Sequence, residues 1–75
     1  MDTTLDRIRP GTEATVLCIN TRASMRERLE DYGLISQTRV ICRYRSPDGG
    51  VTALAFRGTV VAVRTRELRD ISVQV

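Results

Sequence analysis

The sequence predicts a small, mainly β fold in which five short strands carry one helix between the first strand and the second. Segments rich in β-branched and apolar residues recur along the chain, and such residues favour strands. Turn residues separate these segments, above all Pro10-Gly11, residues 46–50 and Arg57-Gly58. Strands at hairpin spacing fit a small barrel or a partly closed sandwich, because both shorten the exposed edges of a sheet.

Length and composition set the frame for this fold. A chain of 75 residues forms at most one domain, spanning residues 1–75, and supports only a modest core. No apolar run approaches the roughly 20 residues that a membrane-spanning helix needs, so we expect no membrane insertion. Residues 1–6 are acidic and lack an apolar centre, so we expect no secretory signal and a cytoplasmic location.

The first elements are a short lead and a long strand. Residues 5–9 read as an edge strand or an extended lead, and residues 14–20 are rich in strand formers. Val16 and Ile19 both look like core residues although they are three positions apart. A bulge near Leu17-Cys18 would reconcile them, since a bulge shifts the alternation of a strand by one residue.

The next segment contains the start and stop signals of a helix. Ser24 and Glu27 form the S-x-x-E pattern of a capping box, in which each side chain accepts a hydrogen bond from a free N–H at the helix start. Gly33 stands where the chain must turn left-handed to end the helix. Leu34 follows as the apolar residue that folds back on Leu29 in a Schellman ending.

Between these signals we expect a loop at residues 21–23 and a helix over about residues 25–32. Met25, Leu29 and Tyr32 fall on one face at helical spacing, and this face should pack on the sheet.

The strand over residues 38–45 has the cleanest alternation in the chain. Val40, Cys42 and Tyr44 should face the core. The alternate positions, which should face water, are Arg39, Ile41, Arg43 and Arg45.

The C-terminal half continues with hairpins. We expect strands over residues 51–57, 60–64 and 71–75, with a single turn at residues 65–70. Glycine in Arg57-Gly58 supplies the positive φ that a tight hairpin requires. The positions that should face the core are Leu54, Phe56, Val61, Val63, Leu68, Ile71 and Val73.

An ordered set of motifs runs through nearly the whole chain. Its members are Leu5 with Ile8, Pro10-Gly11, Val16, Ile19, Arg28-Leu29, Tyr32-Gly33-Leu34, Thr38-Arg39-Val40, Pro47, Gly58, Val61-Ala62-Val63-Arg64, Glu67-Leu68 and Ile71-Ser72-Val73. In this order the motifs resemble the FeoA family, small cytoplasmic proteins of bacterial ferrous iron uptake. The same domain occurs at the end of iron-dependent repressors.

The resemblance implies an SH3-like barrel of five strands with a short helix inserted after the first long strand, where residues 25–32 fall. It also implies a partner, the large membrane ferrous iron transporter, which carries a cytosolic GTPase domain. The chain departs from the family at Ser36-Gln37, where members usually have Pro-Gly, and after Pro47, where a second proline is missing.

The sequence offers little of the chemistry that catalysis needs. It contains neither histidine nor lysine, so the usual general bases are missing. Glu27, Glu30 and Asp31 gather on the predicted helix, where neighbouring acids usually form a solvated face. Gly49-Gly50 lies between two strands, whereas a phosphate-binding loop would precede a helix. We therefore expect no enzyme activity and no cofactor.

The two cysteines are the candidates for metal binding. Cys18 and Cys42 show no paired spacing, so we expect reduced thiols that behave as small hydrophobic residues. Ferrous iron favours histidine, cysteine and carboxylate ligands. The two thiols could approach each other across adjacent strands, but alone they would make an incomplete site, and we expect no metal site.

The predicted docking surface lies at the end of the helix. Leu34 and Ile35 are consecutive apolar residues, and if Leu34 closes on Leu29, then Ile35 points outward. Arg28 and Arg39 would flank this patch and meet carboxylates of a partner. The partner-binding candidates are therefore Arg28, Leu34, Ile35 and Arg39. The alternative is that Ile35 packs under the barrel.

A second interpretation is a nucleic-acid-binding or transcription-regulatory module. The net charge is +3, but nine acidic residues are interspersed with twelve arginines. The stripe of arginines would consist of Arg39, Arg43, Arg45 and Arg57. Single-strand binding also needs exposed aromatic rings, and Tyr32, Tyr44 and Phe56 are all predicted to lie in the core. We expect no nucleic acid as partner, and self-association through short edge strands stays open.

Overall fold

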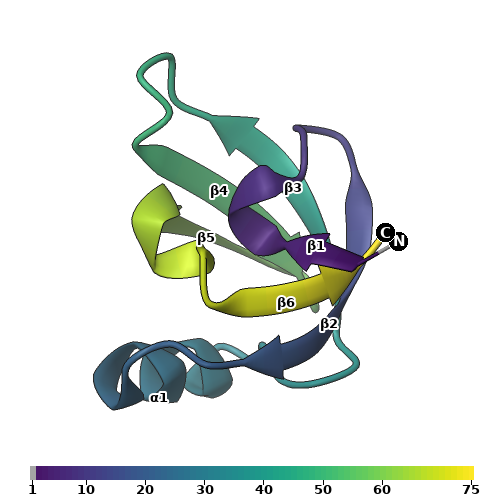
Figure 1. Ribbon diagram of the computed structural model, residues 1–75, viewed down its shortest axis with the longest axis vertical. Helices are drawn as coiled ribbons and strands as arrows, with labels where there is room; N and C mark the ends of the chain where they lie inside the picture. The colour runs from purple at the N-terminus through teal and green to yellow at the C-terminus, as the bar shows by residue number, and fades with distance from the viewer. Residues whose placement is uncertain (1) are drawn as a thin grey trace.

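Six antiparallel strands form one continuous sheet in the computed structural model, which describes residues 2–75 (Figure 1). The elements in chain order are β1 (Asp2–Thr4), the 3-10 helix η1 (Leu5–Arg7), β2 (Glu13–Ile19), α1 (Ala23–Asp31), β3 (Arg39–Arg45), β4 (Val51–Phe56), β5 (Thr59–Arg64), the 3-10 helix η2 (Thr65–Leu68) and β6 (Ile71–Gln74). The predicted class, a mainly β fold with one short helix after the first long strand, is confirmed.

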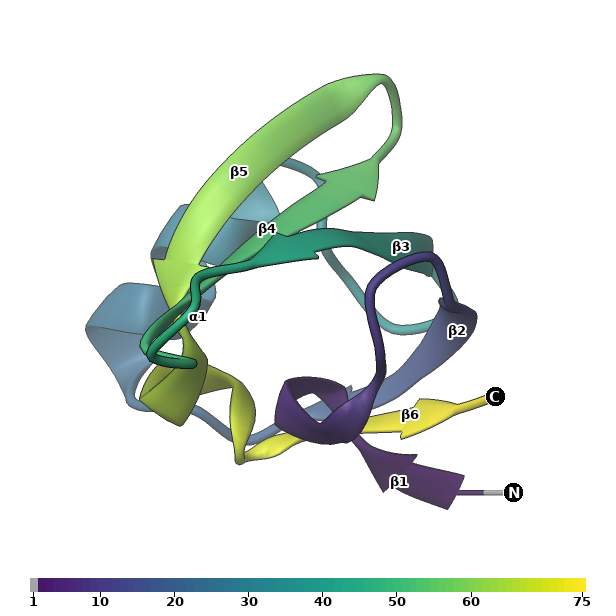
Figure 2. The same ribbon diagram turned by 90° about the horizontal axis from the view of Figure 1, so that it is seen from above.

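The strand order is β1-β6-β2-β3-β4-β5, so β1 and β5 are the two edges of the sheet. The sheet curls around its core, with β3, β4 and β5 on one side and β2, β6 and β1 on the other (Figure 2). Since β1 and β5 do not pair with each other, the barrel stays open. The α1 helix lies outside the curled sheet, at its foot in Figure 1.

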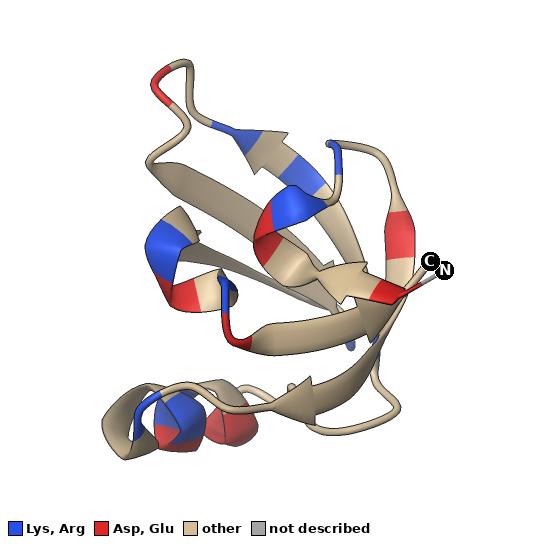
Figure 3. Ribbon diagram, in the orientation of Figure 1, with Lys and Arg blue, Asp and Glu red and all other residues tan. Residues whose placement is uncertain are grey.

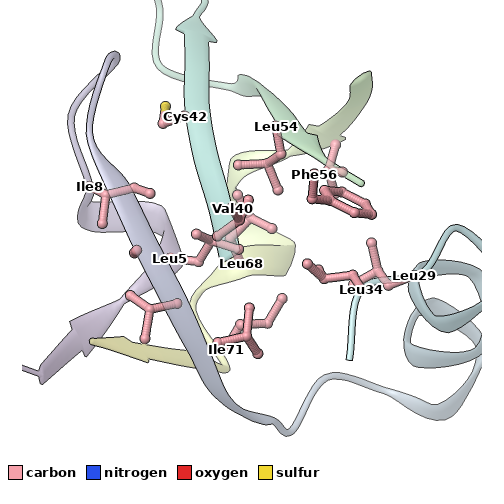
Figure 4. Close-up of a cluster of buried hydrophobic side chains, with 14 of the residues drawn as sticks. Leu5, Ile8, Leu29, Leu34, Val40, Cys42, Leu54, Phe56, Leu68 and Ile71 are labelled. Atoms are coloured by element: carbon pink, nitrogen blue, oxygen red, sulfur yellow. The ribbon is translucent and has the colours of Figure 1, made fainter. Parts of the chain in front are cut away.

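An aliphatic core fills the curl of the sheet (Figure 4). Leucine, isoleucine and valine side chains dominate it, and each one that is fully buried stabilises the fold by about 1.5–3 kcal/mol. The predicted inward positions of β4, β5, η2 and β6 are confirmed, with Val61 only partly buried. The fully buried members are Leu5, Val16, Leu29, Leu34, Val40, Cys42, Leu54, Leu68, Ile71 and Val73.

The bulge predicted in the first long strand is present. Pairing of β2 with β6 shifts register between Val16 and Cys18, so Leu17 is the extra residue. Val16 is fully buried, and Ile19 packs against the same core from its partly buried position. The bulge thus brings two residues three positions apart onto one face.

In β3 the predicted alternation is wrong after Cys42. The pairing with β4 shifts register between Cys42 and Tyr44, which leaves Arg43 as an extra residue. Tyr44, predicted to face the core, is therefore 55% exposed. Arg45, predicted to face water, is half-buried, and its Nε donates a hydrogen bond to Thr52 Oγ1 at 3.0 Å.

The N-terminal prediction also needs correction, because the sheet has a sixth strand. Residues 5–9 do not form the edge strand; it lies earlier, at β1, and pairs with β6 through Asp2 opposite Gln74. A 3-10 turn follows and buries Leu5 and Ile8 beneath the sheet. This edge depends on contact with the far end of the chain, so local sequence does not reveal it.

The predicted capping box at Ser24 and Glu27 is wrong. The helix begins two residues earlier than predicted, at Ala23, and Arg22 occupies the N-cap position without a side-chain capping bond. Ser24 therefore lies inside the first turn, where its hydroxyl is no longer at the cap. A tertiary contact accompanies the earlier start, since Arg22 forms an ion pair with Glu67 of η2 at 3.1 Å.

Candidate protein-docking surface

The end of α1 fixes the direction of the residues that follow it. The Gly33 N–H donates to the Glu30 carbonyl at 2.9 Å, and the Leu34 N–H donates to the Leu29 carbonyl at 2.9 Å. Together with a φ of 100° at Gly33, these bonds form a Schellman motif. The motif turns Leu34 back into the core, where its side chain is fully buried near Leu29 (Figure 4).

A second turn follows at residues 35–38 and holds Ile35 in place. The Thr38 N–H donates to the Ile35 carbonyl and the Ile35 N–H donates to Thr38 Oγ1, both at 3.1 Å. Gln37 has a φ of 74°, as the third position of a type II turn requires. The Gln37 N–H also donates to the Val16 carbonyl at 2.7 Å, so the turn is bonded to β2.

The two turns leave a pair of large apolar side chains in solvent. Ile35 is 44% exposed and Tyr32 is 45% exposed. We call Tyr32 and Ile35 the helix-end patch. Tyr32, predicted to face the core, occupies the C-cap position, beyond the buried face formed by Met25 and Leu29. Ile35 projects outward, as the Schellman geometry requires when Leu34 turns inward.

The other three residues predicted for this surface differ in their exposure to solvent. Leu34 was predicted to contact a partner, and this is wrong because its side chain is fully buried. Arg28 is exposed on α1. Arg39 is exposed at the start of β3, opposite Thr15 of β2. The structure therefore leaves Arg28, Ile35 and Arg39 exposed, whereas Leu34 is buried.

A groove that the sequence did not predict runs between α1 and β5. It has a volume of about 270 Å³, and its charged rim is mainly arginine. Its lining residues are Arg22, Met25, Arg28, Leu29, Tyr32, Val61, Ala62, Val63, Arg64, Arg66 and Glu67. In the sequence these arginines are interspersed with acidic residues, which predicted a mixed-charge surface. No local pattern brings the helix and β5 together, so the groove was not predicted.

The two cysteines do not form a pair. Cys42 is buried and exchanges backbone hydrogen bonds with residues 11 and 12, next to the start of β2. Cys18 is exposed and lies near the other end of that strand. Within residues 2–75 no group of three or more His, Cys, Asp or Glu side chains is arranged to hold a metal ion.

The premise used against nucleic-acid binding needs correction. Of the aromatic residues predicted to lie in the core, only Phe56 is buried, while Tyr32 and Tyr44 are exposed. Two members of the predicted arginine stripe, Arg39 and Arg43, are exposed on β3, whereas Arg45 is bonded to Thr52. Blue and red segments alternate along α1, η1 and η2, so charges of both signs are mixed (Figure 3).

Similar solved structures share this fold. The solution structure of a FeoA protein from Chlorobium tepidum matches with a TM-score of 0.93 at 23% identity, over 97% of this chain and 70% of that one. A crystal structure of an iron uptake regulatory protein, FeoA, matches with a TM-score of 0.86 at 20% identity, over 99% and 97%. A manganese-dependent transcriptional repressor matches with a TM-score of 0.86 at 20% identity, over 97% of this chain but 41% of the repressor. At these identities the likeness concerns the SH3-like fold.

Sequence comparison gives the family. Curated proteins provide no match in sequence. No helix among residues 2–75 has the length and apolar character to cross a bilayer. The model of the FeoA domain matches residues 3–75. Because that match spans almost the whole chain, the chain belongs to the FeoA domain family.

Proposed function

We propose that this chain is a non-enzymatic accessory protein of bacterial ferrous iron uptake, acting as a single domain in the cytoplasm. It docks on the membrane ferrous iron transporter, at its cytosolic GTPase domain. Family membership supports the iron setting, as does the likeness to an iron uptake regulatory protein. The absence of histidine and lysine from the sequence supports a binding role over catalysis.

The observation that carries this proposal is the presentation of Ile35. Its side chain is 44% exposed, while its backbone is held by two hydrogen bonds to Thr38 and by the bonding of the turn to β2. Because this backbone is already fixed, little backbone entropy is lost when a partner binds the exposed side chain, which favours an interface anchor. Arg28 and Arg39 add cationic groups that would meet carboxylates of the GTPase domain.

The test is a titration of the transporter's cytosolic GTPase domain against this protein, with GDP and with a GTP analogue. We expect saturable binding in at least one nucleotide state. Ile35→Asp should raise Kd by at least about tenfold, the scale of an interface anchor. The matched control is Val51→Asp, which places the same charge at another exposed apolar residue on β4 and should leave Kd unchanged. Absence of saturable binding in both states would contradict the proposal.

The second candidate function is nucleic-acid binding through the arginines of β3. Two observations favour it, the exposed ring of Tyr44 next to Arg43 and the fold shared with a transcriptional repressor. A salt titration with single-stranded DNA separates the two functions. Tight binding with a steep negative dependence on salt concentration would support this candidate over docking.

A further inference from the structure

The outer edge of β5 offers unpaired backbone groups. A two-residue turn, Arg57-Gly58, joins β4 to β5, with φ values of 50° and 77°, and Phe56 is paired with Thr59. In such a hairpin the pair that flanks the turn is hydrogen-bonded, and bonded and non-bonded pairs then alternate along the ladder. The ladder is regular, so the backbone N–H and C=O groups of Val60, Ala62 and Arg64 point away from β4.

This free edge forms one wall of the groove beside α1. The groove is lined by every residue from Val61 to Arg64, although Val63 faces the core and Ala62 faces solvent. A groove that touches residues on both faces of a strand lies along the edge of that strand. On the opposite wall are Met25, Leu29 and Tyr32 of α1. The groove therefore lies between α1 and the edge of β5, which is one of the two edges of the open barrel.

The charges around the groove are strongly biased toward one sign. Four arginines line it, at positions 22, 28, 64 and 66, against one acid, Glu67. Since Arg22 pairs with Glu67 at 3.1 Å, the other three arginines have no acidic partner within the groove. This local excess of positive charge differs from the mixed surface elsewhere and favours the binding of an anionic ligand.

From these features we infer that the groove binds an extended peptide segment of a partner protein, as an added strand on β5. The segment alternates apolar and acidic residues, because successive side chains of a strand point to opposite faces. Its apolar side chains contact Met25 and Tyr32, its carboxylates meet Arg64 and Arg66, and its backbone pairs with Ala62 and Arg64. This site goes beyond the proposed docking of Ile35, and its test needs no transporter.

Two other occupants fit the groove less well. A second copy that paired β5 with β5 would add the strand Thr59–Arg64, which contains no acidic residue, so the arginines of the groove would gain no carboxylate partner. A nucleic acid would find one aromatic ring, Tyr32, among aliphatic walls and would leave the N–H and C=O groups of the edge unpaired. An acidic peptide satisfies the charge, the apolar wall and the open edge together.

The first experiment titrates the ¹⁵N-labelled protein with a blocked hexapeptide of alternating glutamate and valine. We expect saturable shifts at the amides of Val60, Ala62 and Arg64. Two isomers carry N-methyl groups on the valines or on the glutamates. One of them should lose binding, because each set of residues presents its N–H groups to one edge of the added strand. Equal binding by both isomers would rule out pairing with β5.

The second experiment tests the charge of the groove with a matched pair of variants. Arg64→Glu should raise Kd for the glutamate–valine peptide by at least about tenfold. Arg43→Glu makes the same change in net charge on β3, outside the groove, and should raise Kd by less than about threefold. Equal effects of the two variants would show that only the overall charge matters.

Three further results would overturn the inference. The first is equal affinity for a control hexapeptide in which lysine replaces each glutamate, which would remove the role of the arginines. The second is tighter binding of a thymidine hexamer at the same amides, which would assign the groove to nucleic acid. The third is a dependence of the Val60 and Ala62 shifts on protein concentration without peptide, which would assign the edge to a second copy.

Discussion

At Gly33 two separate constraints act on one residue. Its φ of 100° lies in the left-handed region, which a residue with a Cβ adopts at a conformational free-energy cost of about 1–2 kcal/mol. A Cβ added there would also lie 2.9 Å from Cδ of Arg57, a side chain that is exposed. The backbone constraint is therefore the larger of the two, since an exposed arginine side chain can move aside.

The prediction is that Gly33→Ala lowers the free energy of unfolding by about 1–2 kcal/mol, as measured by urea denaturation. The control repeats the substitution in an Arg57→Ala background, where the contact with Arg57 is removed. A similar loss in both backgrounds confirms that the left-handed conformation is the cause. No loss in either background would mean that the helix ends elsewhere.

The neighbouring residues Leu34 and Ile35 show how far one residue can be predicted from sequence. Both are apolar, and local sequence gives no reason to bury one and expose the other except the Schellman motif. That motif predicted the direction of each side chain, which the structure places as expected. The prediction that Leu34 contacts a partner was wrong, because its side chain packs into the hydrophobic core and is fully buried.

Among the elements, the turn at residues 35–38 contains a strained position. Gln37 has a φ of 74°, where glycine pays no steric cost. We expect Gln37→Gly to raise the free energy of unfolding by about 0.5–1 kcal/mol, because the gain at Gln37 exceeds the extra entropy that glycine loses on folding. The control is Gln37→Ala, which keeps the steric penalty and should give little gain in urea denaturation. Equal gains would point to the side chain of Gln37 as the source of strain.

The β3–β4 loop holds a carboxylate whose ionised form is favoured. The Ser46 hydroxyl donates to Asp48 Oδ1 at 2.6 Å, and the Gly50 N–H donates to the same oxygen at 2.9 Å. These bonds, the first more than the second, lower the pKa of Asp48. The side chain is fully exposed, so the effect concerns the order of the loop more than global stability.

The sign of the pH dependence follows from that lowered pKa. The contribution of Asp48 is complete above about pH 4, the range of an unfolded aspartate, and is lost as pH falls through the lower folded pKa. We therefore expect the amide of Gly50 to shift in an NMR titration with a midpoint below that of a free aspartate. Asp48→Asn should remove this titration. A midpoint at or above the ordinary value would contradict the two hydrogen bonds.

The two bulged strands differ in what their patterns revealed. In β2 the apolar residues violated alternation, so a bulge was the simplest way to bury both Val16 and Ile19. In β3 the alternation through Tyr44 was regular and gave no sign of a bulge at Arg43. Pairing with β4 decides that case, because Arg45 reaches the buried Thr52 only if the extra residue is present.

At the scale of the whole molecule, the open edge of β5 leads us to predict a pattern of amide hydrogen exchange along this strand. The amides of Val61 and Val63 belong to bonded pairs with β4, whereas those of Val60 and Ala62 face outward. Outward amides should exchange at least about tenfold faster than their neighbours in the free protein, because the bonded amides of Val61 and Val63 exchange only after local opening. Uniform protection along β5 would mean that its edge is already covered. The measurement thus checks the geometry on which the groove depends.

The sequence by itself determined the class of the fold, the position of the helix, most inward residues and the helix ending, because alternation, turn residues and Gly33 act over a few neighbouring residues. It also determined the family, through motifs spread from Leu5 to Val73. Only the tertiary structure decided the pairing of β1 with β6, the bulge at Arg43, the start of α1 beside Glu67 and the groove along β5. Each of these depends on contacts between residues far apart in the chain, and such contacts leave no periodic trace in the local sequence.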